Sequence, residues 1–120
     1  MYGLKKDIDL SFLNGREVIQ VAIGVYQTQF GFDEDVTIYV HSQFSYFDGR
    51  DEWIWKPEGG AAQIAARTLS LLGTTIQSFE GQENGTLSLV FSNGQRLTIF
   101  DNSTEYESYD ITRPGSTVVV

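Results

Sequence analysis

The chain has no cysteine, a single histidine and two prolines among its 120 residues. Without cysteine it can form no disulfide, no thiolate nucleophile and no thiolate-bound metal, and this composition fits a reducing compartment. No serine or cysteine motif accompanies His41 that would make it a catalytic base. One histidine cannot form a zinc site with its sequence neighbours alone, so we expect His41 on the solvent face of a strand. We therefore predict no catalytic site, no metal and no cofactor.

Basic residues and long apolar runs are also scarce. Eight Lys and Arg stand against sixteen Asp and Glu, which gives a net charge of −8. Nucleic acids and anionic membranes require a cationic surface, so neither is expected as a partner, whereas a basic protein remains open. No apolar run approaches the roughly 18 residues of a membrane span. The start, MYGLKKDIDL, has aspartates where a signal peptide has its apolar core, so we expect a cytoplasmic protein.

The residues that are present predict one folded, mainly β domain over residues 1–120, since 41% are hydrophobic and 13% aromatic. A hairpin is indicated by apolar residues on alternate positions around an Asn-Gly step. These residues are Leu87, Leu89, Phe91, Leu97 and Ile99. A three-residue loop, with Gly94 left-handed, pairs Leu89 with Leu97 and puts both apolar rows on one face. A two-residue loop would put them on opposite faces.

The first half of the chain repeats this pattern. If Asp33, Glu34 and Asp35 form the loop, Phe32 faces Val36 and Phe30 faces Ile38. We interpret residues of about 10–47 and 69–109 as an internal pseudo-repeat, in which Val36 to Ile38 correspond to Leu97 to Ile99. The strand that begins at Val36 is expected to run to about Phe47.

One main helix is predicted at about residues 61–72, packed across one face of the sheet. Its apolar stripe consists of Ala61, Ile64, Ala65, Thr68, Leu69 and Leu72.

The expected fold class is α+β, mainly β: an antiparallel sheet or a partly open barrel, built from two duplicated hairpin units. Thr104 and Glu107 have the spacing of a capping box, which indicates one helical turn over residues 105–109. A short strand from Tyr109 to Thr112 is the alternative. Val118 to Val120 are expected to form an edge strand, which leaves a homodimer possible.

Two acidic, aromatic surfaces are candidate sites for a protein partner, because large rings anchor an interface and charge steers a basic partner. The first consists of Asp33, Glu34, Asp35, Asp48, Asp51, Glu52, Trp53 and Trp55. The second consists of Glu105, Tyr106, Glu107 and Tyr109. The alternatives are structural: the tryptophans are edge-strand residues that close the core, and the tyrosines belong to a corner where their hydroxyls bind backbone groups.

The segments FLNGREVIQVAIG, QTQFGF and SNGQRLTIFDNSTEYESYDI resemble an uncharacterised family of small bacterial proteins. That family has a leucine-glycine step, an Asn-Gly hairpin and a terminal Tyr-Glu-Ser-Tyr signature, and it is similar in general character to immunity proteins that block toxins. The resemblance implies a binding module that neutralises a basic toxin domain and is not an enzyme. The alternative is a small-ligand binder or an unrecognised enzyme, with a site between the duplicated halves lined by Tyr26, Phe30, Trp53 or Tyr106.

Overall fold

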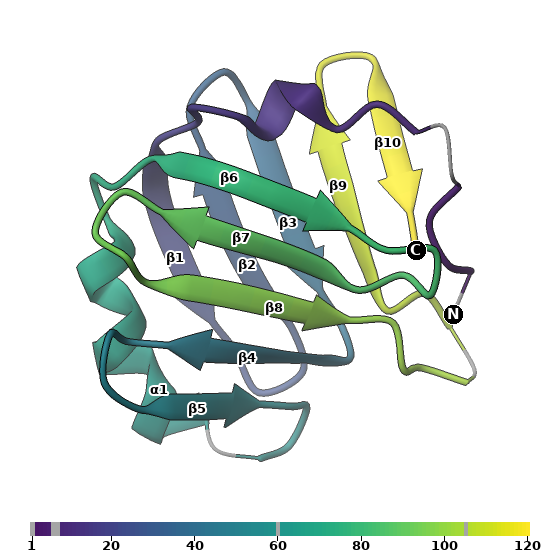
Figure 1. The fold of residues 1–120 in the computed structure, drawn as a ribbon. Helices are drawn as coiled ribbons and strands as arrows, with labels where there is room; N and C mark the ends of the chain where they lie inside the picture. The colour runs from purple at the N-terminus through teal and green to yellow at the C-terminus, as the bar shows by residue number, and fades with distance from the viewer. Residues whose placement is uncertain (1, 6–7, 60, 105) are drawn as a thin grey trace.

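The strands form two antiparallel five-stranded sheets that face each other, and in Figure 1 the strands of one cross those of the other steeply. The computed structural model describes residues 2–5, 8–59, 61–104 and 106–120. The first sheet has the order β1-β2-β3-β9-β10 and the second β5-β4-β8-β7-β6. The strands are β1 (Val18–Ile23), β2 (Thr28–Phe32), β3 (Val36–Val40), β4 (Gln43–Phe47), β5 (Glu52–Trp55), β6 (Ile76–Gly81), β7 (Leu87–Phe91), β8 (Arg96–Phe100), β9 (Tyr109–Arg113) and β10 (Ser116–Val119).

The helical segments are short: η1 (Ser11–Leu13), α1 (Ala61–Thr68) and η2 (Leu69–Leu71), where η marks a 3-10 turn. The predicted class, mainly β with one helix, is confirmed, and the two sheets stay separate instead of closing on each other. Within the described residues, no helix combines the length and the apolar character that a membrane crossing requires.

Both hairpin registers predicted from the alternation are confirmed. Leu89 pairs with Leu97 across β7 and β8, and Gly94 is left-handed with a φ of 84°. Phe30 pairs with Ile38 across β2 and β3. Both loops hold three residues, so Ile38, and not Val36, occupies the place of Leu97. The proposed correspondence of Val36 with Leu97 is therefore wrong by two residues.

The predicted long strand over residues 36–47 is interrupted. The backbone N–H groups of His41 and Ser42 both donate to the carbonyl oxygen of Ser108, at 2.9 and 3.2 Å. These bonds turn the chain from β3 in the first sheet to β4 in the second. The apolar residues of the segment still point inward, where Phe44 makes an edge-to-face contact with Phe30 at 5.2 Å between ring centroids.

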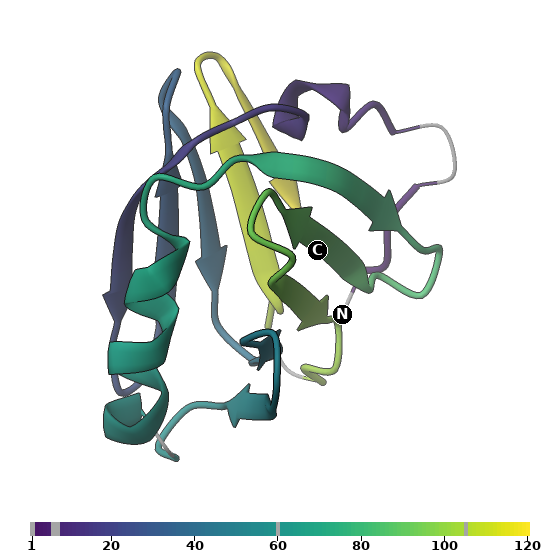
Figure 2. The same ribbon diagram turned by 60° about the vertical axis from the view of Figure 1, so that its left-hand side comes forward.

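The helix closes one side of the sandwich and does not cover a sheet face as expected. Figure 2 shows α1 beside β1, and it also packs against β5, so it bridges the edge strands of the two sheets. Ile64, Thr68 and Leu71 are buried, whereas Leu69 and Leu72 are exposed. The predicted stripe fails at its end because the chain tightens to three residues per turn after Thr68.

The C-terminal segment forms strands. Residues 106–108 form no helical turn, and Tyr109 begins β9, so the alternative prediction of a short strand from Tyr109 is confirmed; Glu105 lies outside the described residues. β10 is an edge strand, as predicted, with Val119 exposed. The homodimer through this edge stays a prediction.

The two halves of the chain have the same order of elements and interlock. Each half forms three strands of its own sheet and then crosses to add two strands to the other sheet. Residues 11–23 correspond to 69–81, residues 28–40 to 87–99, and residues 43–55 to 108–120. At the junction Gly73 N donates to Val18 O and Gly15 N donates to Ile76 O, both at 2.9 Å. The sequence duplication that could explain this symmetry stays a prediction.

Candidate functional site

The internal symmetry allows the edge of β1 to be compared with the edge of β6. At the edge of β1, three large apolar side chains are exposed: Ile19 (59%), Leu69 (52%) and Leu72 (44%). Leu69 and Leu72 belong to one 3-10 turn, closed by Leu72 N donating to Leu69 O at 3.1 Å, so they lie on the same side. Ile19 and Leu72 each follow or precede a member of the hydrogen-bonded pair of Val18 and Gly73, so the backbone of the 3-10 turn lies beside the start of β1.

The equivalent positions on the edge of β6 are polar. Ile19 corresponds to Gln77 on β6, and the two leucines correspond to Ser11 and Asn14 at η1. The backbone contacts are the same on both edges, so this backbone does not require apolar side chains at these positions. Their exposure on one edge only is typical of a surface that binds a partner.

Four acidic residues flank the apolar side chains of the β1 edge. Glu17 N donates to Asp33 Oδ1 at 2.9 Å and Asp33 N donates to Glu17 O at 3.0 Å, so the loop with Glu34 and Asp35 adjoins the start of β1. Arg16 Nη1 lies 3.8 Å from Asp33 Oδ2. On the β6 edge the equivalents of the four acids are neutral. They are Thr75, Ser92, Asn93 and Gly94.

The backbone of this acidic loop is held in an unfavourable conformation. Glu34 and Asp35 have φ angles of 58° and 57°, in the left-handed region that glycine and asparagine adopt most easily. An Asn-Gly pair is the preferred sequence for a turn with two positive φ angles. The chain therefore retains two carboxylates at a cost in backbone energy, as functional sites often do. We define the β1-edge patch as Glu17, Ile19, Asp33, Glu34, Asp35, Leu69 and Leu72.

The predicted acids Asp48, Asp51 and Glu52 lie in the turn between β4 and β5, where Asp48 has a structural role. Its carboxylate accepts hydrogen bonds from Asp51 N (2.8 Å), Arg50 N (2.9 Å) and Trp53 Nε1 (2.9 Å). The N–H groups of Asp51, Trp53 and Arg50 hold the pKa of the Asp48 carboxyl below its ordinary value. This carboxylate organises its own turn.

The two tryptophans lie on the edge strand β5 and pack on the core, as the structural alternative to a partner-binding role predicts. Trp55 is buried, stacks on Phe44 at 5.5 Å and donates from Nε1 to Gly24 O at 3.1 Å. Trp53 is half-buried beneath the guanidinium of Arg67, which lies 3.9 Å from the ring centroid. The burial of Trp55 removes it from any partner-binding surface.

The second predicted surface is also mainly a structural corner. Tyr109 is buried and its hydroxyl donates to Gly85 O at 2.6 Å, so it is not available to a partner. Burial raises the pKa of the Tyr109 hydroxyl well above its ordinary value. Tyr106 is exposed and Glu107 is half-buried. Glu105 lies outside the described residues.

The structure does not bring the predicted acidic groups together. In Figure 1 the turn between β2 and β3 lies at the top, the turn between β4 and β5 at the left, and the described residues between β8 and β9 at the lower right. The residues proposed to line a ligand site between the halves are also not gathered in one place, and a ligand site there stays a prediction. Phe30 is buried in the core, whereas Tyr26 and Tyr106 are exposed, so these side chains do not line one cavity.

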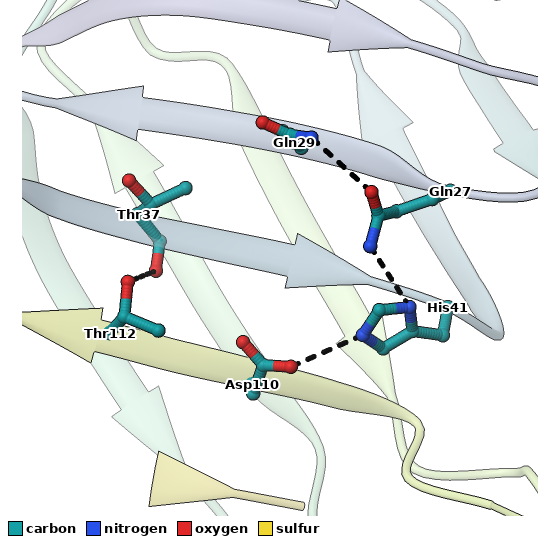
Figure 3. Close-up of polar contacts among 6 residues, drawn as sticks. All are labelled: Gln27, Gln29, Thr37, His41, Asp110 and Thr112. Carbon is teal, nitrogen blue, oxygen red and sulfur yellow. Dashed lines mark hydrogen bonds and ion pairs between the residues drawn. The ribbon is translucent and has the colours of Figure 1, made fainter. Parts of the chain in front are cut away.

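A polar network that the sequence did not indicate lies on the outer face of the first sheet. His41 Nε2 lies 3.2 Å from Asp110 Oδ2, and His41 Nδ1 lies 3.3 Å from Gln27 Nε2 (Figure 3). Within the described part of the chain, His41, Glu107 and Asp110 are the one group of three side chains whose ligand atoms could share a metal ion. His41 and Asp110 are 69 residues apart, so only the register of β3 with β9 could have paired them.

The fold and these surfaces define a two-sheet β-sandwich protein with one acidic and apolar edge. Residues 10–120 match the model of a family described as a family of unknown function (DUF6188), and the chain belongs to that family. No curated protein and no solved structure matches it. The expectation of an uncharacterised family is thus confirmed, while its terminal signature and its similarity to immunity proteins stay predictions.

Proposed function

We propose that this protein is a binding module that holds a basic protein through the β1-edge patch, as an immunity or antitoxin-like protein holds a toxin domain. The observation that carries the proposal is the difference between equivalent edges. One edge combines exposed isoleucine and leucine with four acids, and the other has polar residues or glycine, all uncharged, at those positions. The net charge of −8 supports the same class of partner.

The patch has the composition of an interface with an apolar centre and a charged rim. Burial of each exposed apolar side chain against a partner contributes about 1.5–3 kcal/mol before the costs of association. Glu17, Glu34 and Asp35 are exposed, so they attract a basic surface over a screening length of about 8 Å at physiological salt. The apolar residues are therefore expected to set the lifetime of the complex, and the acids its rate of formation.

The product of the adjacent gene is the partner to test, since toxins and their neutralising proteins are encoded together in the proposed function. Binding of this purified protein is measured by calorimetry with the wild type and with the variant Ile19→Gln, Leu69→Ser, Leu72→Asn. This variant places the residues of the β6 edge on the β1 edge. The matched control is Ser11→Ala, Asn14→Ala, Gln77→Ala, which changes the equivalent positions.

We expect the β1-edge variant to weaken binding by at least about a hundred-fold, because it removes a cluster of apolar anchors. The control variant should bind like the wild type. Absence of binding by the wild type, or equal weakening by both variants, would contradict the proposal. Circular dichroism and a urea midpoint for each variant separate a lost contact from a lost fold.

A further inference from the structure

The polar network on the outer face of the first sheet has the geometry of a metal site. His41 stands at the crossing from β3 to β4, and Asp110 is on β9 (Figure 3). Their side chains are 21% and 17% exposed, so both are reachable but largely shielded. The ligand atoms of His41, Glu107 and Asp110 all lie within 4.8 Å of one another.

Two zinc ligands at tetrahedral angles, each about 2.0–2.1 Å from the ion, are separated by roughly 3.4 Å. The 3.2 Å between His41 Nε2 and Asp110 Oδ2 is close to that value.

The imidazole of His41 is held in place from its other side. Gln27 Nε2 faces His41 Nδ1, and Gln27 Oε1 accepts a hydrogen bond from Gln29 Nε2 at 3.2 Å. Such a second contact orients a ligating histidine and fixes its tautomer. With the Gln27 amide in this orientation, its Nε2 group can only donate to His41 Nδ1, and this assigns the ring proton to Nε2, which faces Asp110 Oδ2. A metal at Nε2 requires that proton to be on Nδ1, and the Gln27 amide can rotate so that its oxygen accepts it.

The charge around this group favours a cation. Two carboxylates, Glu107 and Asp110, meet here, and among the described residues neither forms an ion pair with lysine or arginine. The Glu107 side chain makes no hydrogen bond within the described ranges. A divalent ion would neutralise both carboxylates, which a neutral imidazole cannot do.

The two halves of the chain differ at the connection that carries this group. In the first half the chain crosses between sheets through His41 and Ser42 alone, whereas the second half uses residues 101–108. This longer connection brings Glu107 to the group. On the second sheet the places of His41 and Asp110 are taken by Phe100 and Ser45. The group is therefore not a requirement of the shared fold.

We propose that His41, Glu107 and Asp110 form a binding site for one divalent transition-metal ion, of which Zn²⁺ is the probe. One imidazole nitrogen and two carboxylate oxygens are ligands that Zn²⁺ accepts, and three protein ligands leave a position open to water. The site is separate from the β1-edge patch. It therefore does not depend on the proposed protein partner.

The test uses the full chain without a histidine tag, stripped of metal and titrated with Zn²⁺ by calorimetry. Because His41 is the single histidine, its ¹⁵N ring signals need no assignment. We expect one ion per chain and a change of the ring from the Nε2–H to the Nδ1–H tautomer.

Substitutions then identify the ligands. His41→Gln, Glu107→Gln and Asp110→Asn should each weaken Zn²⁺ binding by at least about ten-fold, and Gln27→Leu by about ten-fold through loss of the orienting contact. Glu80→Gln, on the outer face of β6, removes the same charge elsewhere and should bind like the wild type. Urea midpoints verify that each variant is folded.

Three kinds of result would overturn the proposal, and the third concerns the class of ion. One is the absence of Zn²⁺ binding by the wild type at up to millimolar metal. Another is binding that leaves the His41 ring signals unchanged or survives in His41→Gln, which would mean adsorption to surface carboxylates only. Parallel titrations with Mn²⁺ and Ca²⁺ establish the class of ion, and a preference for Ca²⁺ over Zn²⁺ would contradict a site built on imidazole nitrogen.

Discussion

The edge of β1 and the edge of β6 share their backbone hydrogen bonds but not their side chains. At both edges a glycine that follows a 3-10 turn donates to the first residue of a strand, at 2.9 Å. At both, a side-chain oxygen of the hairpin loop, from Asp33 or Ser92, accepts a backbone N–H. The β1 edge then adds exposed apolar residues and acids at positions where the β6 edge has neither. The fold accounts for what the edges share, so the difference requires another explanation, and we assign it to a partner.

The outer faces of the two sheets differ in the same way. Across β2, β3 and β9 one outward row consists of Gln29, Tyr39 and Asp110, and the crossing next to this row presents His41. The equivalent row on β7, β8 and β4 consists of Ser88, Thr98 and Ser45. Of these two rows, the first carries ionisable groups in contact and the second carries none, and the metal site is proposed on the first.

Substitutions in the core should have the largest effect on the free energy of unfolding, and this effect should be equal in the two halves. Leu13 and Leu71 are equivalent, and both are fully buried under their 3-10 turns. Leu13→Ala and Leu71→Ala should each lower the free energy of unfolding by about 2–5 kcal/mol, since both leave a cavity. Urea denaturation measures both. A loss in one variant only would show that the halves are not equivalent in their packing.

The second largest effect on stability is expected at Tyr109, whose equivalent in the first half is Phe44. Tyr109→Phe removes the hydroxyl that binds Gly85 O and leaves a buried carbonyl unpaired, which should cost about 1–3 kcal/mol. The measurement is the urea midpoint at pH 7.

The same variant should also change how the free energy of unfolding depends on pH in alkaline solution. The pKa of Tyr109 is raised in the folded state, so its contribution is fully present below the ordinary tyrosine pKa of about 10 and is lost as the pH rises above it. Tyr109→Phe should therefore show a smaller loss of stability between about pH 10 and 11 than the wild type. Burial also raises the pKa of Tyr46, so part of the slope should remain. An unchanged slope would contradict the burial of Tyr109.

A smaller effect, of opposite sign, is expected in the acidic loop. Glu34→Asn with Asp35→Gly relieves the left-handed backbone and should raise the free energy of unfolding by about 1–2 kcal/mol. The same change should slow association with a basic partner and reduce its salt dependence, because two charges are lost. Chemical denaturation and stopped-flow mixing report the two quantities. A destabilised double variant would mean that the loop carries no strain.

The smallest effect on stability should come from the patch itself. Ile19→Gln, Leu69→Ser and Leu72→Asn affect exposed side chains, so each should change the free energy of unfolding by no more than about 0.5 kcal/mol. A loss of several kcal/mol in the triple variant would show that these residues stabilise the fold, and the assignment to a partner would fail.

The sequence predicted best what short-range alternation determines. The pairs of Leu89 with Leu97 and of Phe30 with Ile38 follow from period-two patterns and loop length, because a slip by one residue would expose the whole row. The crossing at His41 was missed because the apolar alternation continues through it, from Val40 to Phe44, and only the distant Ser108 carbonyl turns the chain.

The candidate sites were harder to predict, for two physical reasons. Acidic residues and large rings look alike in sequence whether they bind a partner or organise a turn, as Asp48 and Trp55 show. Leu69 and Leu72 continue a helical stripe in the sequence, and only the tighter 3-10 turn exposes them. The His41 group joins two strands far apart in the chain, and no local pattern indicates such a pair.

The most direct test of the account is a map of backbone amide shifts when the unlabelled product of the adjacent gene is added to the labelled protein. We predict that the shifts concentrate at residues 17–19, 33–35 and 69–72, and that the equivalent residues 75–77, 92–94 and 11–14 stay unchanged. Equal shifts on both edges, or shifts confined to the outer faces of the sheets, would contradict the claim that the β1-edge patch is the binding surface.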